Sequence, residues 1–491
     1  MIERNESFLE KARALEPVLR HRAVHKAPDA EPLAEGGRLV LDFGEHLVGF
    51  LSLRLDFTGS HPDAPVWLRV RFAEREQELS ERVEDYHGWI SASWVQQEQL
   101  HVDVLPGTVS LQRRYAFRYV SVEVLGISSK YRLIVREASV DAVTSADENA
   151  LLPFESDDEQ LRAMDRIACH TLRDCMQRVF EDGPKRDRRL WMGDLRLQAL
   201  ANYETYQNHA LVKRCLYLFA GSTLPGGKVG AGMFLDPEIE VDDTEMFDYA
   251  LLFAPTLLDY ARATNDTQTL QELWPTAKRQ IELARTRFDQ HDVIRDSDVL
   301  GWCFLDWNLA LNKQAGAQGV YLYALQAALE LARMTGDREF SMFARKELAA
   351  KRRAALERLY DPDLGLFISG AKSQVSYASQ IWMVLGGVVS GEEAAQLLQR
   401  VAAYPDAVTI VTPYLYHHYI QALLDCGEKA RALETLRYYW GGMVDAGADT
   451  FWELYNPDNP EESPYGGTIV NSYCHAWSCA PAYFLRKYFQ R

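Results

Sequence analysis

The first third of the chain alternates apolar and polar residues with a period of two. Residues 51–57 read Leu-Ser-Leu-Arg-Leu-Asp-Phe, and residues 66–72 and 119–124 repeat the alternation. Because successive side chains of a strand point to opposite faces, this pattern is typical of strands that bury one face. Turns rich in Gly, Pro, Asp and Ser separate the runs, as at residues 58–63. The pattern predicts an antiparallel β-sandwich over residues 1–150.

The hydrophobic period changes to that of helices near residue 155. Ser156 and Glu159 have the spacing of a capping box, which predicts that a helix begins there. From this point to the C-terminus apolar residues recur at helical spacing, and no run favours a strand. We expect helices to begin near residues 156, 190, 211, 245, 267, 316, 337, 373, 391, 411, 428 and 477.

Short turns such as residues 264–267 and 335–337 join these helices in pairs. Six hairpins favour an (α/α)6 barrel over residues 151–491, with loops at one end forming a deep pocket. A superhelical array is the alternative, but the sequence has no repeat of fixed period. A chain of 491 residues is also too long for one core. The predicted fold class is multidomain β plus all-α, an antiparallel β-sandwich followed by an (α/α)6 barrel.

The net charge and the cysteine content limit the partners, the cofactors and the cellular compartment that we expect for this protein. The net charge of -17 argues against nucleic acid or an anionic membrane, whereas a neutral sugar tolerates it. Seven cysteines without CxxC or zinc-like spacing indicate free thiols in a reducing compartment, and no metal or cofactor is predicted. The N-terminus lacks the apolar core of a signal peptide, and no stretch reaches the roughly 20 apolar residues of a membrane span. We expect a cytoplasmic protein.

The most unusual segment is residues 181–194, which packs three aspartates, four basic residues and Trp191 between two apolar helices. The Gly-Pro pair at residues 183–184 forces a turn, so this segment is a loop that opens into a helix near Leu190. Neighbouring arginines tune carboxylates, and the face of Trp191 can stack on a sugar ring. A solvated charged loop is the alternative interpretation.

Two further clusters place carboxylates beside aromatic residues. Glu453 follows Phe451 and Trp452, an apolar setting that raises a pKa into the range of a general acid or base. Its alternative is a surface glutamate beside a core tryptophan. Residues 301–308 include Trp302, Asp306 and Trp307. A single tryptophan more often belongs to the core, but several beside carboxylates are typical of a carbohydrate site.

At these residues the chain resembles the α-L-rhamnosidases of glycoside hydrolase family 78. The similar segments, in chain order, are residues 41–49, 154–158, 182–187 with 193–194, 450–453 and 471–475. The resemblance implies an inverting glycoside hydrolase that releases terminal α-L-rhamnose from small rhamnosylated glycosides. A homodimer is a further expectation, from the compact architecture alone.

The resemblance also implies roles for residues. Glu453 would be the general base. Larger family members carry a glutamate as general acid where this chain has Arg188, and the guanidinium cannot donate a proton at useful rates. Asp187 is therefore the candidate acid. The candidate substrate-binding residues are Asp182, Arg186, Trp191, Asp194, Trp302, Asp306, Trp307, Trp440, Trp452 and His475.

Two alternatives to this function remain. Arg188 could remodel the pocket, which would give a six-hairpin glycosidase with another sugar preference. The missing glutamate could also leave a sugar-binding protein without catalysis.

Overall fold

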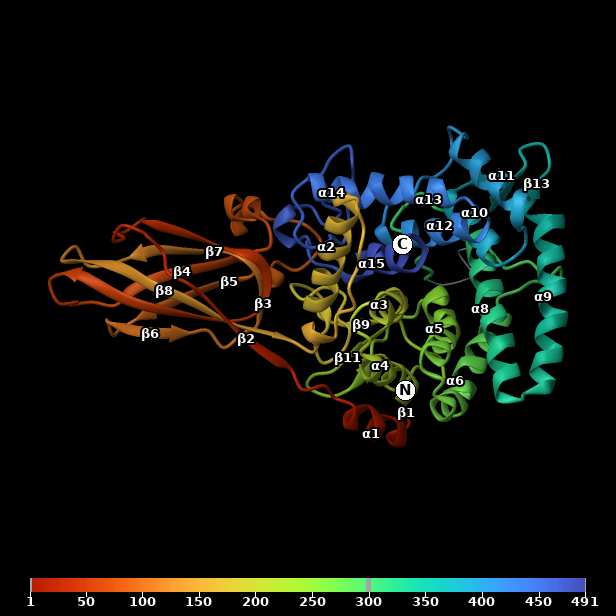
Figure 1. Ribbon diagram of the computed structural model, residues 1–491, viewed down its shortest axis with the longest axis horizontal. Coiled ribbons are helices and arrows are strands. Elements are labelled where there is room, and N and C mark those ends of the chain that lie inside the picture. Colours follow the sequence, from red (N-terminus) through yellow and green to blue (C-terminus); the bar gives the residue numbers. More distant parts are fainter. Residues whose placement is uncertain (1, 297–301, 491) are drawn as a thin grey trace.

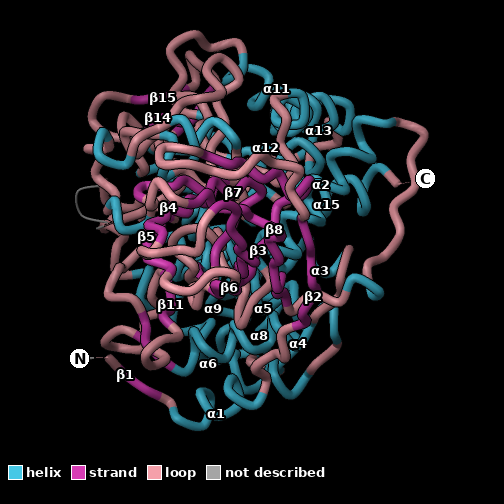
Figure 2. Tube along the Cα trace, turned by 90° about the vertical axis from the view of Figure 1, so that its left-hand side faces the viewer, coloured by secondary structure: helices cyan, strands magenta, loops and turns pink. Residues whose placement is uncertain are grey.

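A computed structural model describes residues 2–296 and 302–490 of the chain. Figure 1 shows strands gathered at one end of an elongated molecule and helices at the other. Seen from the strand end, the sheets lie in front of the helices (Figure 2). Within the described ranges, no helix combines the length and apolarity needed to cross a bilayer.

The strand-rich domain is one antiparallel sheet with the order β2-β8-β3-β7-β4-β5, and β6 pairs with β3. Buried side chains from these strands form one core. The strands are β2 (Arg20–Lys26), β3 (Arg38–Gly59), β4 (Val66–Ala73), β5 (Gln97–Val102), β6 (Gly107–Ser110), β7 (Tyr115–Gly126) and β8 (Tyr131–Thr144).

The long strand β3 is shared by the two parts of this sheet. Its first half, residues 38–49, pairs with β7, whereas residues 49–59 pair with β8 and residues 52–55 also pair with β6. Leu51, Leu53 and Leu55 point into the core, as a period of two requires. The predicted antiparallel, sheet-rich N-terminal domain is confirmed.

In the described part of the chain, twelve helices form six hairpins in two rings, as the helical periodicity predicted. The outer ring has α2 (Glu159–Cys175), α4 (His209–Gly221), α6 (Thr267–Arg285), α9 (Arg338–Arg358), α11 (Gly391–Ala402) and α13 (Lys429–Leu436). The inner ring has α3 (Met192–Glu204), α5 (Phe247–Thr264), α8 (Gln314–Thr335), α10 (Tyr377–Leu385), α12 (Pro413–Asp425) and α15 (Ala480–Phe484). From α3 to α12 each helix packs on the next, α15 packs on α3, and the His417 ring of α12 contacts the Phe484 ring of α15 at 4.8 Å.

Burial explains which helices lie inside. On α5 every residue from 247 to 261 is buried except Asp259, because the helix is surrounded by neighbours. On α11 only Ala394, Leu397, Leu398 and Val401 are buried, the spacing of a single apolar face. A helix apolar on all sides therefore belongs to the inner ring.

Two local predictions were wrong. Helix α2 begins at Glu159, and its N-cap is Asp158, whose carboxylate accepts from the Leu161 amide at 3.2 Å. Ser156 instead accepts from the Asp158 amide, so the predicted capping box does not form. The helical half also contains short strands: β9 (Leu190–Trp191), β10 (Ser222–Thr223), β11 (Gly232–Phe234), β12 (Glu240–Val241), β13 (Tyr360–Asp361), β14 (Leu366–Ser369) and β15 (Gln374–Val375). These short strands lie in the loops that connect the helices.

The first fifteen residues pack on the helical domain rather than on the sheet. Strand β1 (Glu3–Arg4) pairs with β10, and helix α1 (Glu6–Ala14) packs against α4. In Figure 1 the N-terminus and α1 lie beside α4 and α6, and β2 leads from there to the sheet. The domain boundary at residue 150 stays a prediction. The range 1–150 assigned to the N-terminal domain includes these first fifteen residues, which pack on the helical domain instead.

Candidate active site

Residues 246–249 and 302–307 line part of a pocket of about 240 Å³, and three further segments meet there. They are the 181–194 loop, the 450–477 segment before α15, and the 75–95 insertion between β4 and β5. The insertion reaches the helical domain because Val95 packs with Tyr465, Ile469 and Val470. Most of the predicted site residues line this pocket: Asp182, Arg186, Asp187, Trp191, Asp194, Trp302, Trp307, Glu453 and His475.

Three predicted residues lie outside the pocket, and their side chains are buried in the core. Buried Asp306 accepts hydrogen bonds from the amides of Val411 and Thr412 at 2.8 and 3.0 Å, which anchors the start of α12. The Trp440 indole donates to the Ser478 carbonyl at 2.8 Å. The Trp452 ring is buried under the Arg75 guanidinium, 4.5 Å from its centroid.

The pocket also contains residues that were not among the predicted site residues. The aromatic ones are Trp89, Tyr249, Phe304, Tyr465 and Trp477, and the others are Ile90, Arg189 and Met246. Trp477 lies at the start of a predicted helix, but this position alone is weak evidence for a binding site, because a single tryptophan more often belongs to the core. Trp89 and Ile90 had no signal, because they belong to the other domain.

The 181–194 loop is closed at its base. The Asp182 amide donates to the Arg189 carbonyl at 2.9 Å, and the Arg189 amide returns a bond to the Asp182 carboxylate at 3.0 Å. A side chain on Gly183 would meet the Ser472 hydroxyl at 2.6 Å, so only glycine fits there. The Ala476 amide donates to the Asp182 carbonyl at 2.9 Å. These bonds hold the loop against the 450–477 segment.

Arg188 does not line the pocket. Its backbone φ is +62°, and its guanidinium donates to the Arg114 carbonyl in the sheet domain at 2.9 Å. Burial beside Arg114 lowers the pKa of Arg188 to about 10. The residue that stands in the glutamate position thus contributes to the contact between domains.

Glu453 is buried and held by two donors. The Tyr465 hydroxyl donates to one carboxylate oxygen at 2.7 Å, and Arg186 Nη2 binds the other. The Glu453 amide donates to the Ser472 carbonyl at 3.0 Å, which fixes the backbone. Burial raises the pKa of Glu453, while Arg186 and the Tyr465 hydrogen bond oppose the shift.

Asp187 is the most exposed carboxylate of the site, with 22% of its side chain accessible, against 7% for Glu453. Its Oδ1 lies 3.7 Å from Arg186 Nη1. One guanidinium therefore contacts Asp187 through one nitrogen and Glu453 through the other. The ring of Tyr465 faces this guanidinium at 4.2 Å and keeps it in place.

Two more carboxylates surround His475. Asp182 lies 4.0 Å from its Nε2, and Asp194 lies 3.9 Å from its Nδ1, which has no hydrogen-bond partner within the described ranges. Burial raises the pKa of Asp194 to about 8, and burial together with neighbouring aspartates raises the pKa of Asp182 well above its ordinary value. Burial and Arg186 lower the pKa of His475 well below 6.5. At neutral pH Asp194 is therefore protonated and His475 neutral.

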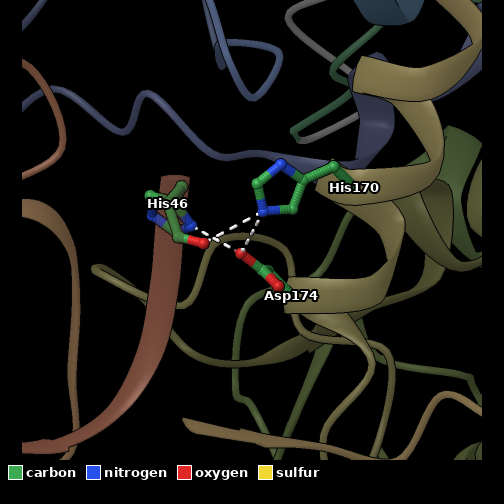
Figure 3. Close-up of side chains that lie close together, drawn as sticks. All are labelled: His46, His170 and Asp174. Carbon is green, nitrogen blue, oxygen red and sulfur yellow. Dashed lines mark hydrogen bonds and ion pairs between the residues drawn. The ribbon is translucent and has the colours of Figure 1, made fainter. Parts of the chain in front are cut away.

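A second group of buried ionisable residues lies between the domains. We call His46, Glu74, His170 and Asp174 the interdomain cluster. His46 Nδ1 lies 2.7 Å from the Asp174 carboxylate, and its Nε2 lies 3.1 Å from that of Glu74. His170 Nε2 lies 3.0 Å from the His46 carbonyl and 3.3 Å from Asp174 (Figure 3).

The cluster members His46, His170 and Asp174 are close enough to bind a metal ion. Both ring nitrogens of His46 already face carboxylates, however. Burial lowers the pKa of His46, but Cys474, Asp174 and Glu74 together raise it well above 6.5. A doubly protonated imidazolium cannot ligate a metal, so this arrangement fits an ion-pair cluster that joins the two domains.

Carboxylates and aromatic faces around a small pocket, at one end of a six-hairpin barrel, are typical of a glycoside hydrolase. Residues 150–489 match the bacterial α-L-rhamnosidase six-hairpin glycosidase domain, and residues 10–142 match the N-terminal domain of glycosyl hydrolase family 78 α-rhamnosidases. The chain belongs to the α-L-rhamnosidases of glycoside hydrolase family 78.

Solved structures agree with this assignment. A rhamnosidase from Klebsiella oxytoca with rhamnose bound is 47% identical, covers 99% of both chains and superimposes with a TM-score of 0.96. A family 78 rhamnosidase of Bacillus sp. GL1 shares the fold at 23% identity and a TM-score of 0.76, over 93% of this chain and 47% of its own. No curated protein matches the chain significantly.

Proposed function

We propose that this enzyme releases terminal α-L-rhamnose from small rhamnosylated glycosides with inversion at the anomeric carbon, with Glu453 as general base and Asp187 as general acid. The observation that supports the pair best is the contact of both carboxylates with the single Arg186 guanidinium. The similar Klebsiella oxytoca enzyme has rhamnose bound. The seven cysteines are free, in keeping with action in the cytoplasm.

In this mechanism Glu453 takes a proton from a water molecule, and the oxygen of that water attacks the anomeric carbon. The bond to the glycosidic oxygen breaks, and Asp187 gives that oxygen a proton, which releases the aglycone as an alcohol. Arg186 and Tyr465 favour the ionised form of Glu453 that the base requires. Asp187, more exposed than the other three carboxylates, stands on the side from which an aglycone can leave.

The remaining polar groups would bind the sugar. Asp182, protonated Asp194 and neutral His475 can exchange hydrogen bonds with its hydroxyls, and Trp191 and Trp307 offer apolar faces. A pocket of about 240 Å³ is smaller than sites that enclose drug-sized ligands. It suits a single deoxyhexose, which favours removal of terminal residues.

The test is p-nitrophenol release from p-nitrophenyl α-L-rhamnoside by the wild type, Asp187→Asn and Glu453→Gln. We expect both variants to lose activity, Asp187→Asn less so on this substrate than on methyl α-L-rhamnoside, because p-nitrophenolate leaves without a proton. Proton NMR of the first product should show β-L-rhamnose.

Other results would revise the proposal. A first product with the α configuration would exclude inversion. Full activity of Asp187→Asn on the methyl glycoside would move the acid to another residue. A wild type that cleaves other aryl glycosides but no rhamnoside would have another specificity, and one that binds rhamnose without turnover would be a binding protein.

A further inference from the structure

Three carboxylates of the sheet domain contact the two segments that carry the proposed catalytic residues. They lie directly after β4 and belong to Glu74, Glu78 and Glu81. Their partners are, in the same order, the Tyr473 amide at 2.6 Å, the Lys185 ammonium and the Ile469 amide at 3.3 Å. Lys185 lies in the 181–194 loop, and the two amides lie in the 450–477 segment. The sheet domain therefore holds both segments at once.

The contact between Glu78 and Lys185 is enclosed by protein. The Glu78 side chain is 3% exposed and that of Lys185 is 1% exposed. The second Glu78 oxygen accepts from the Glu74 and Arg75 amides at 2.9 and 2.8 Å, which fixes the carboxylate within its own domain. Lys185 also donates to the Asn471 carbonyl at 2.8 Å. Because a buried ammonium without a partner is costly, the position of Lys185 depends on that of Glu78.

Arg186 follows Lys185 in the chain, and its side chain lines the pocket, whereas that of Lys185 does not. The two side chains bind consecutive carbonyls, because Lys185 donates to that of Asn471 and Arg186 Nε donates to that of Val470 at 3.0 Å. The two remaining nitrogens of Arg186 contact the two proposed catalytic carboxylates. A displacement of Lys185 would therefore move the guanidinium that both carboxylates share.

Catalytic groups have to be held to within about half an ångström of their working positions, and a misplacement of about 1 Å can lower a rate by about 100-fold. We propose that Lys185 and Glu78 are positioning residues: Glu78 holds Lys185, and Lys185 sets the Arg186 guanidinium between the general acid and the general base. This inference rests on the proposed function, because it concerns the same catalytic pair. It also assigns the sheet domain a role in catalysis.

The test measures kcat and KM of Lys185→Met and Glu78→Gln on p-nitrophenyl α-L-rhamnoside, at a temperature at which each variant is folded. Both changes nearly keep the size of the side chain and remove the ion pair. We expect kcat to fall by about 10- to 100-fold in each variant, from misplacement of the catalytic groups. KM should change by less than about threefold, because the groups that bind the sugar keep their own contacts.

The pH profile of kcat/KM gives a second measurement. Burial raises the pKa of Glu453, and Arg186 opposes the shift. A displaced Arg186 opposes it less, so the pH below which activity is lost should be higher in Lys185→Met than in the wild type. A loss of stability alone would not move this limb of the profile, provided that the protein is folded throughout. An unchanged limb in a variant with lowered kcat would overturn the proposal.

The double variant Glu78→Gln/Lys185→Met separates positioning from stability. Glu78→Gln alone leaves the Lys185 ammonium buried without its main partner, and the second change removes that ammonium. The melting temperature of the double variant should therefore exceed that of Glu78→Gln, while kcat stays low. Recovery of kcat together with stability would overturn the proposal, and so would wild-type kcat in either single variant.

Asp174→Asn is the matched control. It also removes a buried carboxylate that joins the two domains, but Asp174 contacts neither Lys185 nor the pocket. Its kcat should stay within about twofold of the wild type once the protein is folded, because the catalytic groups keep their positions. An equal loss of kcat in this variant would show that any weakened contact between the domains lowers activity, which would overturn the assignment to Lys185.

Crystal structures of the wild type and Lys185→Met test the placement without hydrolysis. We expect Arg186 to lose its contact with Asp187 or Glu453 in the variant. An Arg186 that keeps both contacts would overturn the proposal whatever the wild type hydrolyses. A wild type that cleaves no rhamnoside would instead contradict the proposed function, and the structures would still decide whether Lys185 places Arg186.

Discussion

The two groups of buried ionisable residues differ in how their charges are compensated. In the interdomain cluster, charges of opposite sign are paired: His46 lies between Glu74 and Asp174, and Arg173 donates to Asp174 at 2.8 Å. In the pocket, Asp187 and Glu453 share the Arg186 guanidinium, and Asp182 and Asp194 flank the neutral His475, while the second cation, Arg189, is paired with Asp242.

The pKa shifts follow from this difference. Although burial favours the neutral form, Arg173, His170 and His46 hold the pKa of Asp174 well below 3.8. Burial raises the pKa of Asp194 to about 8, because no cation among the described residues contacts it. Two aspartates with equal burial thus have opposite protonation states at neutral pH. Removing one partner of a buried ion pair is costly, whereas buried carboxylates with strongly shifted pKa values are typical of functional sites.

The largest effect should come from Glu453→Gln, which removes the proposed base without creating a cavity. We expect kcat to fall by about 10²- to 10⁴-fold, since that is the usual contribution of a general base. Because the change also leaves buried Arg186 with one carboxylate partner fewer, the melting temperature should fall as well, and activity is compared at a temperature at which both proteins are folded. Glu461→Gln, a change at a 51% exposed glutamate of the same segment, is the control and should keep full activity.

Asp174→Asn should have the next largest effect, and on stability rather than catalysis. The change leaves imidazolium His46 and Arg173 buried with fewer negative partners, which costs about 3 kcal/mol or more in the free energy of unfolding. Because the pKa of Asp174 is lowered, its contribution is present above pH 3.8 and is lost as the pH falls below that value. Denaturation in urea at pH 7, and again at a pH below 3.8, measures this difference. Equal stability of variant and wild type at pH 7 would contradict it.

Asp194→Asn should change stability in the opposite direction. The unfolded chain ionises Asp194 near pH 3.8, whereas the folded protein keeps its proton until about pH 8, so wild-type stability falls as the pH rises between these values. Asparagine avoids this cost. We expect the variant to be more stable than the wild type by about 1–3 kcal/mol at pH 7 and nearly equal to it at pH 4. A destabilised variant at pH 7 would show that the carboxylate is ionised and paired.

The smallest effect is expected from Asp141→Asn. Asp141 forms a pair with His21 at 2.9 Å on the surface of the sheet domain, where both side chains are more than half exposed. Water and salt screen such a pair, so the free energy of unfolding should change by well under ~1 kcal/mol. The same urea experiment measures it. A loss as large as that of Asp174→Asn would mean that burial does not explain the contrast between the clusters.

Much of the fold followed from periodicity. The change of period near residue 155 separated the sheet from the helices, and the predicted helix starts lie within a few residues of those observed, from α2 at Glu159 to α15 at Ala480. The capping box failed because several polar residues in a row can cap a helix, and only the geometry selects Asp158. The short strands β9 and β11 pair across loops and have no local pattern.

The pocket was predicted less completely. The 181–194 loop and Glu453 were found because unusual residues lie together in the sequence. In the sequence Asp306 had the same surroundings as the pocket carboxylates, since it also lies beside tryptophans. Its carboxylate instead accepts hydrogen bonds from the amides at the start of α12, more than one hundred residues away. Trp440 and Trp452 were selected for their residue type, and packing places both in the core.

The sequence by itself determined which faces of the strands and helices are buried, which loops carry carboxylates, and the family, because these properties are local or repeated in order along the chain. Only the tertiary structure decided what each face packs against. It turned Arg188 toward the sheet domain, set Arg186 between Asp187 and Glu453, and brought Trp89 to the mouth of a pocket in the other domain. These relations join residues that are 74 to 375 positions apart in the sequence, and a hydrophobic pattern specifies burial without specifying the partner.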